Sequence, residues 1–283
     1  MEVGRFIRVG KAYCGVVTLM AGPGKDWDSH LLLLYRDEDH RQASVGSWIQ
    51  RGLDRGEKVF YSTAPDDPAS MSELQPGTDG VARAVRQGQF TFIPLEELFP
   101  GAAQPAMVRA ALAEGYPGVR FSAQANAALG SVGDEDYQAI DHLMDELCAR
   151  LPVSALCQYN AARNDGRTLA TVIDCHPDAV RDAQMRLRRL EDRVALAGAV
   201  DLGSAEVLAH ALHRICQLDG SSEVVLDLSE LTFVDVAGCR ALVTGTDGLR
   251  RAGGTVICRG ASGHIGKVMS LLGLDRLHGM ALA

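Results

Sequence analysis

The chain alternates between short apolar runs and longer segments in which apolar residues recur every three or four positions. Residues 31–35 and 224–228 are short, largely apolar runs of the kind that forms buried strands. In residues 42–55, by contrast, large apolar side chains such as Trp48 and Ile49 fall on one face of a helix. Segments of these two kinds follow one another along most of the chain, which predicts an α/β protein built on a mostly parallel sheet.

The N-terminal part repeats strand–helix units. The strand at 31–35 and the helix at 42–55 are followed by further predicted elements, namely strands at 59–62, 90–93, 118–122 and 153–158, and helices near 105–115, 135–150 and 168–175. Repeated alternation of apolar strands with helices predicts a three-layer domain, in which helices cover both faces of a parallel sheet.

The clearest domain boundary lies around residues 177–184, because Pro177 discourages continuation of the preceding helix. We therefore predict an N-terminal domain over 1–182 and a C-terminal domain over 183–283. The elements predicted in the second domain are strands at 185–191 and 193–200, a helix after Ser204, a strand at 224–228, a helix entered through Asp235 and reaching about residue 249, a strand at 255–258 and a helix after Ser262. Their order predicts a mixed α/β sheet.

Composition and charge narrow the function classes. The 283 residues are 47% hydrophobic and carry a net charge of −8. The excess of negative charge lies in residues 1–182, which hold 17 Lys+Arg and 25 Asp+Glu, whereas residues 183–283 hold 11 of each. An acidic surface disfavours binding to nucleic acid. No apolar run approaches the roughly 20 residues of a membrane span, and the seven cysteines lack CxxC spacing, which favours reduced thiols. We expect a cytoplasmic protein that binds neither nucleic acid nor membrane.

The most informative segment is 224–242, in which a strand leads through an Asp-x-x-Gly step into a helix. This pattern strongly resembles the STAS family, the anti-sigma-factor-antagonist fold of bacterial partner switching, over essentially all of 184–283. The resemblance implies a module that binds an anti-sigma factor or a related kinase-fold protein. In the regulatory members a phosphorylatable serine follows the aspartate, whereas Val236 follows Asp235 here.

The resemblance implies a partner-binding surface made by Thr232, Phe233, Asp235, Val236, Ala237, Gly238 and Arg240. Two alternatives stay open. Val236 can pack under its loop, so that the domain serves as a scaffold or a homodimerisation element, and Asp235 can serve only its own helix, where a carboxylate interacts favourably with the dipole. The nearby hydroxyl of Ser229 fits a turn or capping role, as does that of Thr232.

The N-terminal part resembles the MEDS domain, a sensory module, over roughly 25–182. The segments that carry this resemblance are 30–39 (HLLLLYRDED), 52–61 (GLDRGEKVFY), 118–120 (GVR), 157–159 (CQY) and 176–177 (HP). The layout is also similar to RecA-like ATPases. The sequence departs from the MEDS pattern after residue 120, where relatives tend to have an acidic residue and a tryptophan and this chain has neither.

A RecA-like layout raises the question of nucleotide binding. A phosphate-binding loop needs glycines and a lysine followed by Ser or Thr. The corresponding segment 35–42, in which we predict a polar loop over 36–40, has no glycine and no lysine and places three carboxylates where phosphates would lie. The Gly-Pro-Gly-Lys sequence at 22–25 lacks the rest of the motif. We therefore expect no cofactor and no enzymatic activity.

A ligand pocket of the N-terminal domain remains a candidate, because parallel sheets bind ligands beyond the carboxyl ends of their strands. Its candidate residues are His30, Tyr35, Arg36, Ser62, Ala64, Cys157, Tyr159 and His176. His30, Cys157 and His176 carry metal-binding groups, but they lack short ligand spacing, so we expect no metal. The sequence thus predicts a non-enzymatic bacterial signalling regulator of the anti-sigma factor antagonist type. One alternative is a small-molecule or metal sensor whose STAS domain only relays the signal or dimerises, and another is a residual nucleotide-binding enzyme.

Overall fold

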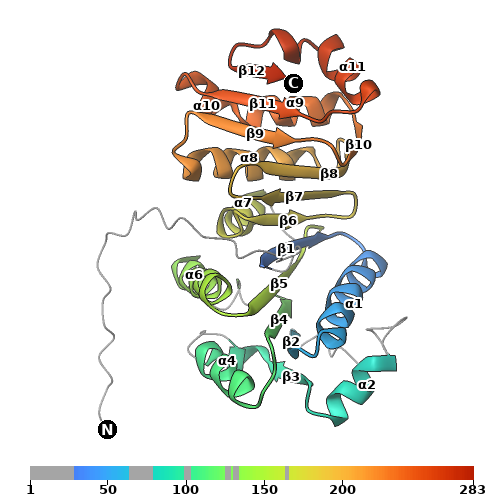
Figure 1. Cartoon of the computed structure of the whole chain (residues 1–283), viewed down its shortest axis with the longest axis vertical. Helices are drawn as coiled ribbons and strands as arrows, with labels where there is room; N and C mark the ends of the chain where they lie inside the picture. Colours follow the sequence, from blue (N-terminus) through green and yellow to red (C-terminus); the bar gives the residue numbers. More distant parts are fainter. Residues whose placement is uncertain (1–28, 64–78, 99–102, 125–128, 130–133, 163–165) are drawn as a thin grey trace.

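The computed structural model describes residues 29–63, 79–98, 103–124, 129, 134–162 and 166–283 (Figure 1). Its strands form one continuous 12-stranded sheet in the order β12-β11-β9-β8-β7-β6-β1-β5-β4-β2-β3, with β10 paired to β8. Helices cover both faces of the N-terminal strands, whereas the buried residues of the C-terminal strands form one cluster with α8, α9 and α11. None of the helices in these ranges is long and apolar enough to cross a bilayer.

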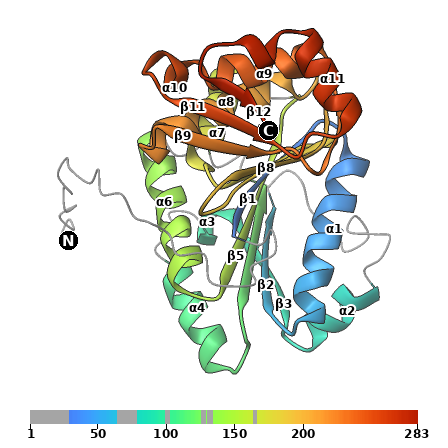
Figure 2. The same ribbon diagram turned by 45° about the horizontal axis from the view of Figure 1, so that its top comes forward.

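The N-terminal part is a parallel sheet between two helical layers. Its strands are β1 (His30–Tyr35), β2 (Lys58–Thr63), β3 (Phe90–Pro94), β4 (Val119–Gln124) and β5 (Val153–Asn160), and its helices are α1 (Glu38–Asp54), α2 (Asp79–Arg86), α3 (Leu95–Leu98), α4 (Gln104–Ala113), α6 (Asp134–Arg150) and α7 (Gly166–Cys175). Figure 2 shows α1 and α2 on one face of the sheet and α4 and α6 on the other. Each face is packed by its own cluster of buried side chains. The predicted α/β class and three-layer arrangement are confirmed.

The C-terminal part continues the same sheet. Its elements are β6 (Ala179–Arg181), β7 (Met185–Arg189), β8 (Val194–Val200), α8 (Ala205–Asp219), β9 (Glu223–Asp227), β10 (Leu231–Val234), α9 (Val236–Gly245), α10 (Asp247–Arg251), β11 (Thr255–Arg259), α11 (Gly263–Leu271), the 3₁₀ turn η1 (Leu274–Arg276) and β12 (Met280–Leu282). β6 pairs in parallel with β1 and antiparallel with β7, so the hairpin between β6 and β7 joins the two halves. The predicted boundary at 182–183 falls within this hairpin.

One hydrophobic core crosses the junction between the halves. It includes Leu32 and Val172 from the N-terminal half together with Leu208 and Leu242 from the C-terminal half. Helix α7 packs against α8, and the Arg214 guanidinium donates a hydrogen bond of 3.2 Å to the carbonyl oxygen of Asp174. The two halves therefore share both a sheet and a core.

Two helix boundaries differ from those predicted. The prediction of a polar loop over 36–40 is wrong, because α1 already begins at Glu38: the Asp37 carboxylate accepts a 2.8 Å hydrogen bond from the backbone N–H of His40 and caps the helix. The helix predicted to run from Asp235 to about residue 249 is divided at Thr246 into α9 and α10.

Two of the segments that resemble the MEDS domain have a structural role. The guanidinium of Arg120, on β4, forms an ion pair with the carboxylate of Glu57, stacks on the Trp48 ring at 4.6 Å and donates a 3.1 Å hydrogen bond to the Trp48 carbonyl oxygen. Arg120 is fully buried. A Cβ on Gly52 would lie 2.3 Å from its Cδ, so glycine makes room for this side chain under α1.

Replacing Glu57 by alanine is expected to lower the free energy of unfolding by about 3 kcal/mol, because the buried guanidinium of Arg120 loses its carboxylate partner. Urea denaturation followed by circular dichroism measures this change. The exposed Glu114 at the end of α4 provides the control, and its alanine variant should unfold within about 0.5 kcal/mol of the parent. Equal unfolding midpoints for the two variants would contradict a structural role for the Glu57–Arg120 pair.

Candidate functional site

The first candidate site is the connection between β10 and α9. Asp235 is the N-cap of α9, and its carboxylate accepts a 2.8 Å hydrogen bond from the backbone N–H of Gly238. The backbone N–H of Asp235 donates to the carbonyl oxygen of Val200 on β8. The aspartate therefore does serve its own helix, and this capping fixes the start of α9 beside the end of β10.

Apolar side chains on both sides of Asp235 face solvent. Phe233 is 50% exposed and Val236 is 58% exposed, so Val236 does not pack under its loop. We call the surface formed by Thr232, Phe233, Asp235, Val236, Ala237 and Arg240 the β10–α9 face. Gly238, which was predicted to belong to this surface, is buried, and a Cβ there would lie 2.8 Å from the carbonyl oxygen of Val200. Its role is to let α9 approach β8.

Local hydrogen bonds account for the two hydroxyl groups near this face. The hydroxyl of Ser229 donates to the carboxylate of Asp227 at 2.7 Å, and that of Thr232 donates to the carbonyl oxygen of Gly198 at 2.8 Å. The Ser229 contact agrees with the turn role predicted from the sequence, whereas the Thr232 hydroxyl bonds across from β10 to β8 and so serves neither a turn nor a helix cap.

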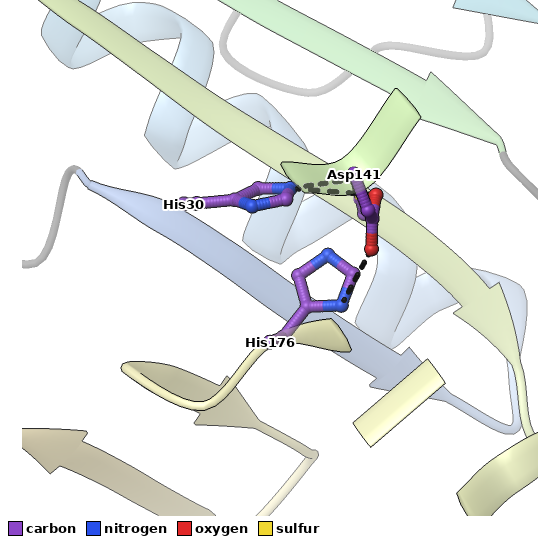
Figure 3. A group of neighbouring side chains, drawn as sticks. His30, Asp141 and His176 are labelled. Carbon is purple, nitrogen blue, oxygen red and sulfur yellow. Dashed lines mark hydrogen bonds and ion pairs between the residues drawn. The ribbon is translucent and has the colours of Figure 1, made fainter. Parts of the chain in front are cut away.

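The second candidate site lies on the sheet face covered by α6 and α7, close to the junction of the two halves. It brings together His30 at the start of β1, Asp141 of α6, Cys157 of β5 and His176, which follows α7. One potential ligand atom from each of these four residues lies within 4.8 Å of the others. Figure 3 shows the two imidazole rings and the carboxylate converging from three different segments. We call these four residues the His–Asp–Cys cluster.

The Nδ1 of each imidazole in the cluster has a hydrogen-bonding partner outside the four residues. The Nδ1 of His30 lies 2.6 Å from the carboxylate of Asp145, and the Nδ1 of His176 lies 2.7 Å from the carbonyl oxygen of Val172. Three contacts connect the residues of the cluster. The Nε2 of His30 lies 3.4 Å from the Sγ of Cys157 and 3.8 Å from the Oδ1 of Asp141, and the Nδ1 of His176 lies 3.5 Å from the Oδ2 of Asp141.

Burial controls the protonation of the cluster. Burial by itself would lower the pKa of His30, but the negative charges available at Cys157 and Asp145 raise that pKa well above its usual value. Burial and the neighbouring His30 lower the pKa of His176 to about 3. Burial raises the pKa of Asp141 to about 7 and also raises that of the Cys157 thiol. The two imidazoles of the cluster therefore differ in proton affinity, which is raised at His30 and lowered at His176.

The residues predicted for the ligand pocket do not form one site. Tyr159 joins the cluster, because its ring contacts that of His176 with centroids 6.2 Å apart. Tyr35 contacts Arg41 of α1 instead, and Arg36 is exposed. Ser62 is buried in β2, which two strands separate from β1. Ala64, like the 22–25 segment, lies outside the described residues.

A polar network occupies the carboxyl end of the N-terminal strands. The buried Arg41 donates hydrogen bonds of 3.1 Å to the hydroxyl of Tyr61 and to the Oε1 of Gln158, and it forms an ion pair with Glu38. The amide of Gln158 donates in turn to the hydroxyl of Ser122. Buried side chains therefore fill the region beside residues 35–42, the segment that corresponds in position to a phosphate-binding loop.

Sequence reasoning missed Asp141 and Asp145. Their only signal is spacing: the two carboxylates are four residues apart on α6, on the helix side that also carries the buried Tyr137 and Met144. Acidic residues on an otherwise apolar helix face require buried partners, which His30 and His176 supply.

Comparison with known families accounts for both halves of the chain. The family model described as "MEDS: MEthanogen/methylotroph, DcmR Sensory domain" matches residues 29–177, and the model described as "Mlab, STAS domain" matches residues 183–280. Since the first match covers more than half of the chain, the protein belongs to the MEDS family, and a STAS domain follows its MEDS domain. Both resemblances seen in the sequence are confirmed. No curated protein matches the chain significantly.

Three solved structures are similar to parts of the chain. The unphosphorylated anti-sigma factor antagonist SpoIIAA is 16% identical, with 35% of this chain and 86% of that one covered and a TM-score of 0.28. An anti-sigma factor antagonist from Mycobacterium paratuberculosis is 23% identical, with 34% and 83% covered and a TM-score of 0.28. The flagellar accessory protein FlaH from Methanocaldococcus jannaschii is 12% identical, with 59% and 74% covered and a TM-score of 0.40.

Proposed function

We propose that the protein is a non-enzymatic bacterial signalling regulator that acts as an anti-sigma factor antagonist-like protein. Its β10–α9 face binds an anti-sigma factor or a related kinase-fold protein. The observation that carries this proposal is the exposure of Phe233 and Val236 on either side of Asp235, within a STAS domain. Exposed aromatic and aliphatic side chains beside a fixed carboxylate are suited to protein docking.

Phosphorylation at the position after Asp235 does not regulate this interaction, because Val236 has no hydroxyl group. Control of the interaction passes to the MEDS domain. Direct packing between helices supports this part of the proposal: α7 of the MEDS domain contacts α8, α8 contacts α9, and α9 begins at Val236. A change at the end of α7 therefore has a contiguous path of packed helices to the docking face.

Replacing Phe233 by serine is expected to weaken partner binding at least tenfold, because truncation of an aromatic side chain at the centre of an interface typically costs about 2 kcal/mol or more. The measurement is isothermal titration calorimetry of the full chain against each purified anti-sigma kinase encoded in the same genome.

The matched control is Leu271→Ser on α11, since Leu271 is 83% exposed but lies outside the β10–α9 face. This variant should bind like the parent, and both variants should keep the melting temperature of the parent. If the parent binds none of these kinases, or if the Phe233 and Leu271 variants bind equally well, the docking proposal is wrong.

A second candidate function is that of a small-molecule or metal sensor in which the STAS domain only relays the signal or dimerises. The observation that favours it is the His–Asp–Cys cluster, which lies beside the junction of the two domains and ends at His176, next to α7.

A further inference from the structure

We propose that His30, Asp141, Cys157 and His176 form a binding site for one divalent transition-metal ion of the zinc class. The proposal concerns the MEDS domain and does not depend on the docking function of the STAS domain. It reverses the expectation drawn from the sequence, where only three scattered ligands were apparent. The structure adds Asp141 as a fourth and brings all four together.

The spacing of the donor atoms suits a tetrahedral ion. Zinc bonds of about 2.0 Å to nitrogen or oxygen and about 2.3 Å to sulfur place neighbouring ligand atoms roughly 3.3–3.6 Å apart. The Nε2 of His30 lies 3.4 Å from the Sγ of Cys157 and 3.8 Å from the Oδ1 of Asp141. All four ligand atoms fall within 4.8 Å of one another, so adjustments of about an ångström or less complete the coordination.

Both imidazoles are oriented to present Nε2 to the ion. The Nδ1 of His30 contacts the carboxylate of Asp145, and the Nδ1 of His176 contacts the carbonyl oxygen of Val172 at 2.7 Å and, less closely, the Oδ2 of Asp141 at 3.5 Å. Such outer contacts fix the tautomer and the orientation of metal-binding histidines. The two histidines are 3% and 1% exposed, so the rings have little freedom to turn away.

An unsatisfied atom points into the cluster. The Nε2 of His176 is buried and has no hydrogen-bond partner among the described residues. Figure 3 shows this nitrogen facing the space between His30 and Asp141. Burying a polar atom without a partner is costly, and a metal ion in that space would satisfy the free lone pair.

The ligand set selects the class of ion. Two imidazoles, one thiolate and one carboxylate suit Zn²⁺ and similar borderline ions, whereas Mg²⁺ and Ca²⁺ require oxygen ligands. The ion would connect β1, β5, α6 and the segment after α7, which lies directly before β6 at the junction with the STAS domain.

The test is a titration of the full chain, freed of metal by a chelator, with Co²⁺ as a spectroscopic substitute for Zn²⁺. We expect one Co²⁺ per chain, visible bands typical of tetrahedral coordination and a near-ultraviolet band from the thiolate–cobalt bond. Zn²⁺ should displace the cobalt and abolish the bands. Cys157→Ser should remove the thiolate band and weaken binding at least tenfold.

Two further variants make the result decisive. Cys216→Ser is the matched thiol control, because Cys216 is also partly buried but lies on α8, and it should leave the cobalt spectrum unchanged. Asp145→Asn keeps all four ligands but weakens the contact behind His30, so metal affinity should fall about 10–100-fold. Folded protein that gives no thiolate–cobalt band, or a Cys157→Ser variant that binds cobalt like the parent, would overturn the assignment. Neither measurement involves the protein partner, so the docking proposal stands or fails separately.

Discussion

Gly198→Ala is expected to lower the free energy of unfolding by at least about 3 kcal/mol, the largest effect we expect from any single methyl group in this chain. Gly198 lies in β8 with a φ of 87°, a conformation that L-residues adopt only at a cost. A Cβ there would also lie 2.0 Å from the backbone carbonyl oxygen of Gln184. Because this obstacle is backbone, no side-chain rotation relieves it.

The position of Gly198 in the sheet explains why the chain needs it. The first residues of β8 pair with β9, whereas the residues from Gly198 onward pair with β10, and the register shifts there as in a β-bulge. The carbonyl oxygen of Gly198 accepts the hydrogen bond from Thr232. The bulge thus positions β10 and, through it, the β10–α9 face.

Gly253→Ala separates the cost of the left-handed backbone conformation from the cost of the close contact with Gln184. Gly253 has nearly the same φ of 86°, but a Cβ there would meet nothing within 4 Å. Its alanine variant should lower the free energy of unfolding by only about 1–2 kcal/mol, because only the left-handed backbone conformation is unfavourable there. Urea denaturation followed by circular dichroism compares the two variants directly. If they unfold at the same denaturant concentration, the contact with Gln184 is relieved by local movement and the bulge does not hold β10 in place.

Val236→Asp is expected to weaken binding of the kinase-fold partner tenfold or more, which corresponds to about 1.4 kcal/mol. The substitution places a carboxylate beside Asp235 on the β10–α9 face, where it imitates the charge that a phosphoserine supplies in regulatory STAS domains. The fold should tolerate it, since Val236 is 58% exposed and an acidic residue in the first turn of α9 interacts favourably with the helix dipole.

Two controls accompany this measurement by calorimetry in the absence of ATP. Val236→Thr adds a hydroxyl without charge and should bind within about threefold of the parent. Leu271→Asp adds the same charge at an exposed apolar position of α11 and should also bind normally. Equal affinities for the parent and the Val236→Asp variant would show that this position lies outside the interface. If Leu271→Asp lowers the affinity for the partner as much as Val236→Asp does, the cause is the change in net charge and not the position of the carboxylate.

The long, periodic segments of the chain could be predicted, and the short or unusual ones could not. The apolar run of β1 and the amphipathic pattern of α1 appear directly in the sequence. β6, β10 and β12 were missed, because strands of three or four residues are too short to show a period. The start of α1 was placed too late, because its polar first turn is stabilised by the Asp37 cap rather than by apolar packing.

The candidate sites follow the same division. The residues of the β10–α9 face were indicated by the resemblance to the STAS family, and local structure alone brings Phe233, Asp235 and Val236 together because they are nearly adjacent in sequence. Their exposure, and the burial of Gly238 among them, depends on how α9 approaches β8. The His–Asp–Cys cluster could be predicted only in part, because His30 and Asp141 are 111 residues apart and meet only when α6 packs on the sheet.

By itself the sequence determined the α/β class, the order of most elements, the MEDS and STAS families and the absence of a hydroxyl after Asp235, because each of these depends on residue type and local spacing. Only the tertiary structure decided that the two domains share one sheet and one core, that Asp141 faces two histidines and a thiol, and that Arg41 fills the end of the N-terminal strands. These features arise from contacts between segments distant in sequence, and no periodic pattern along the chain records which distant side chains will meet.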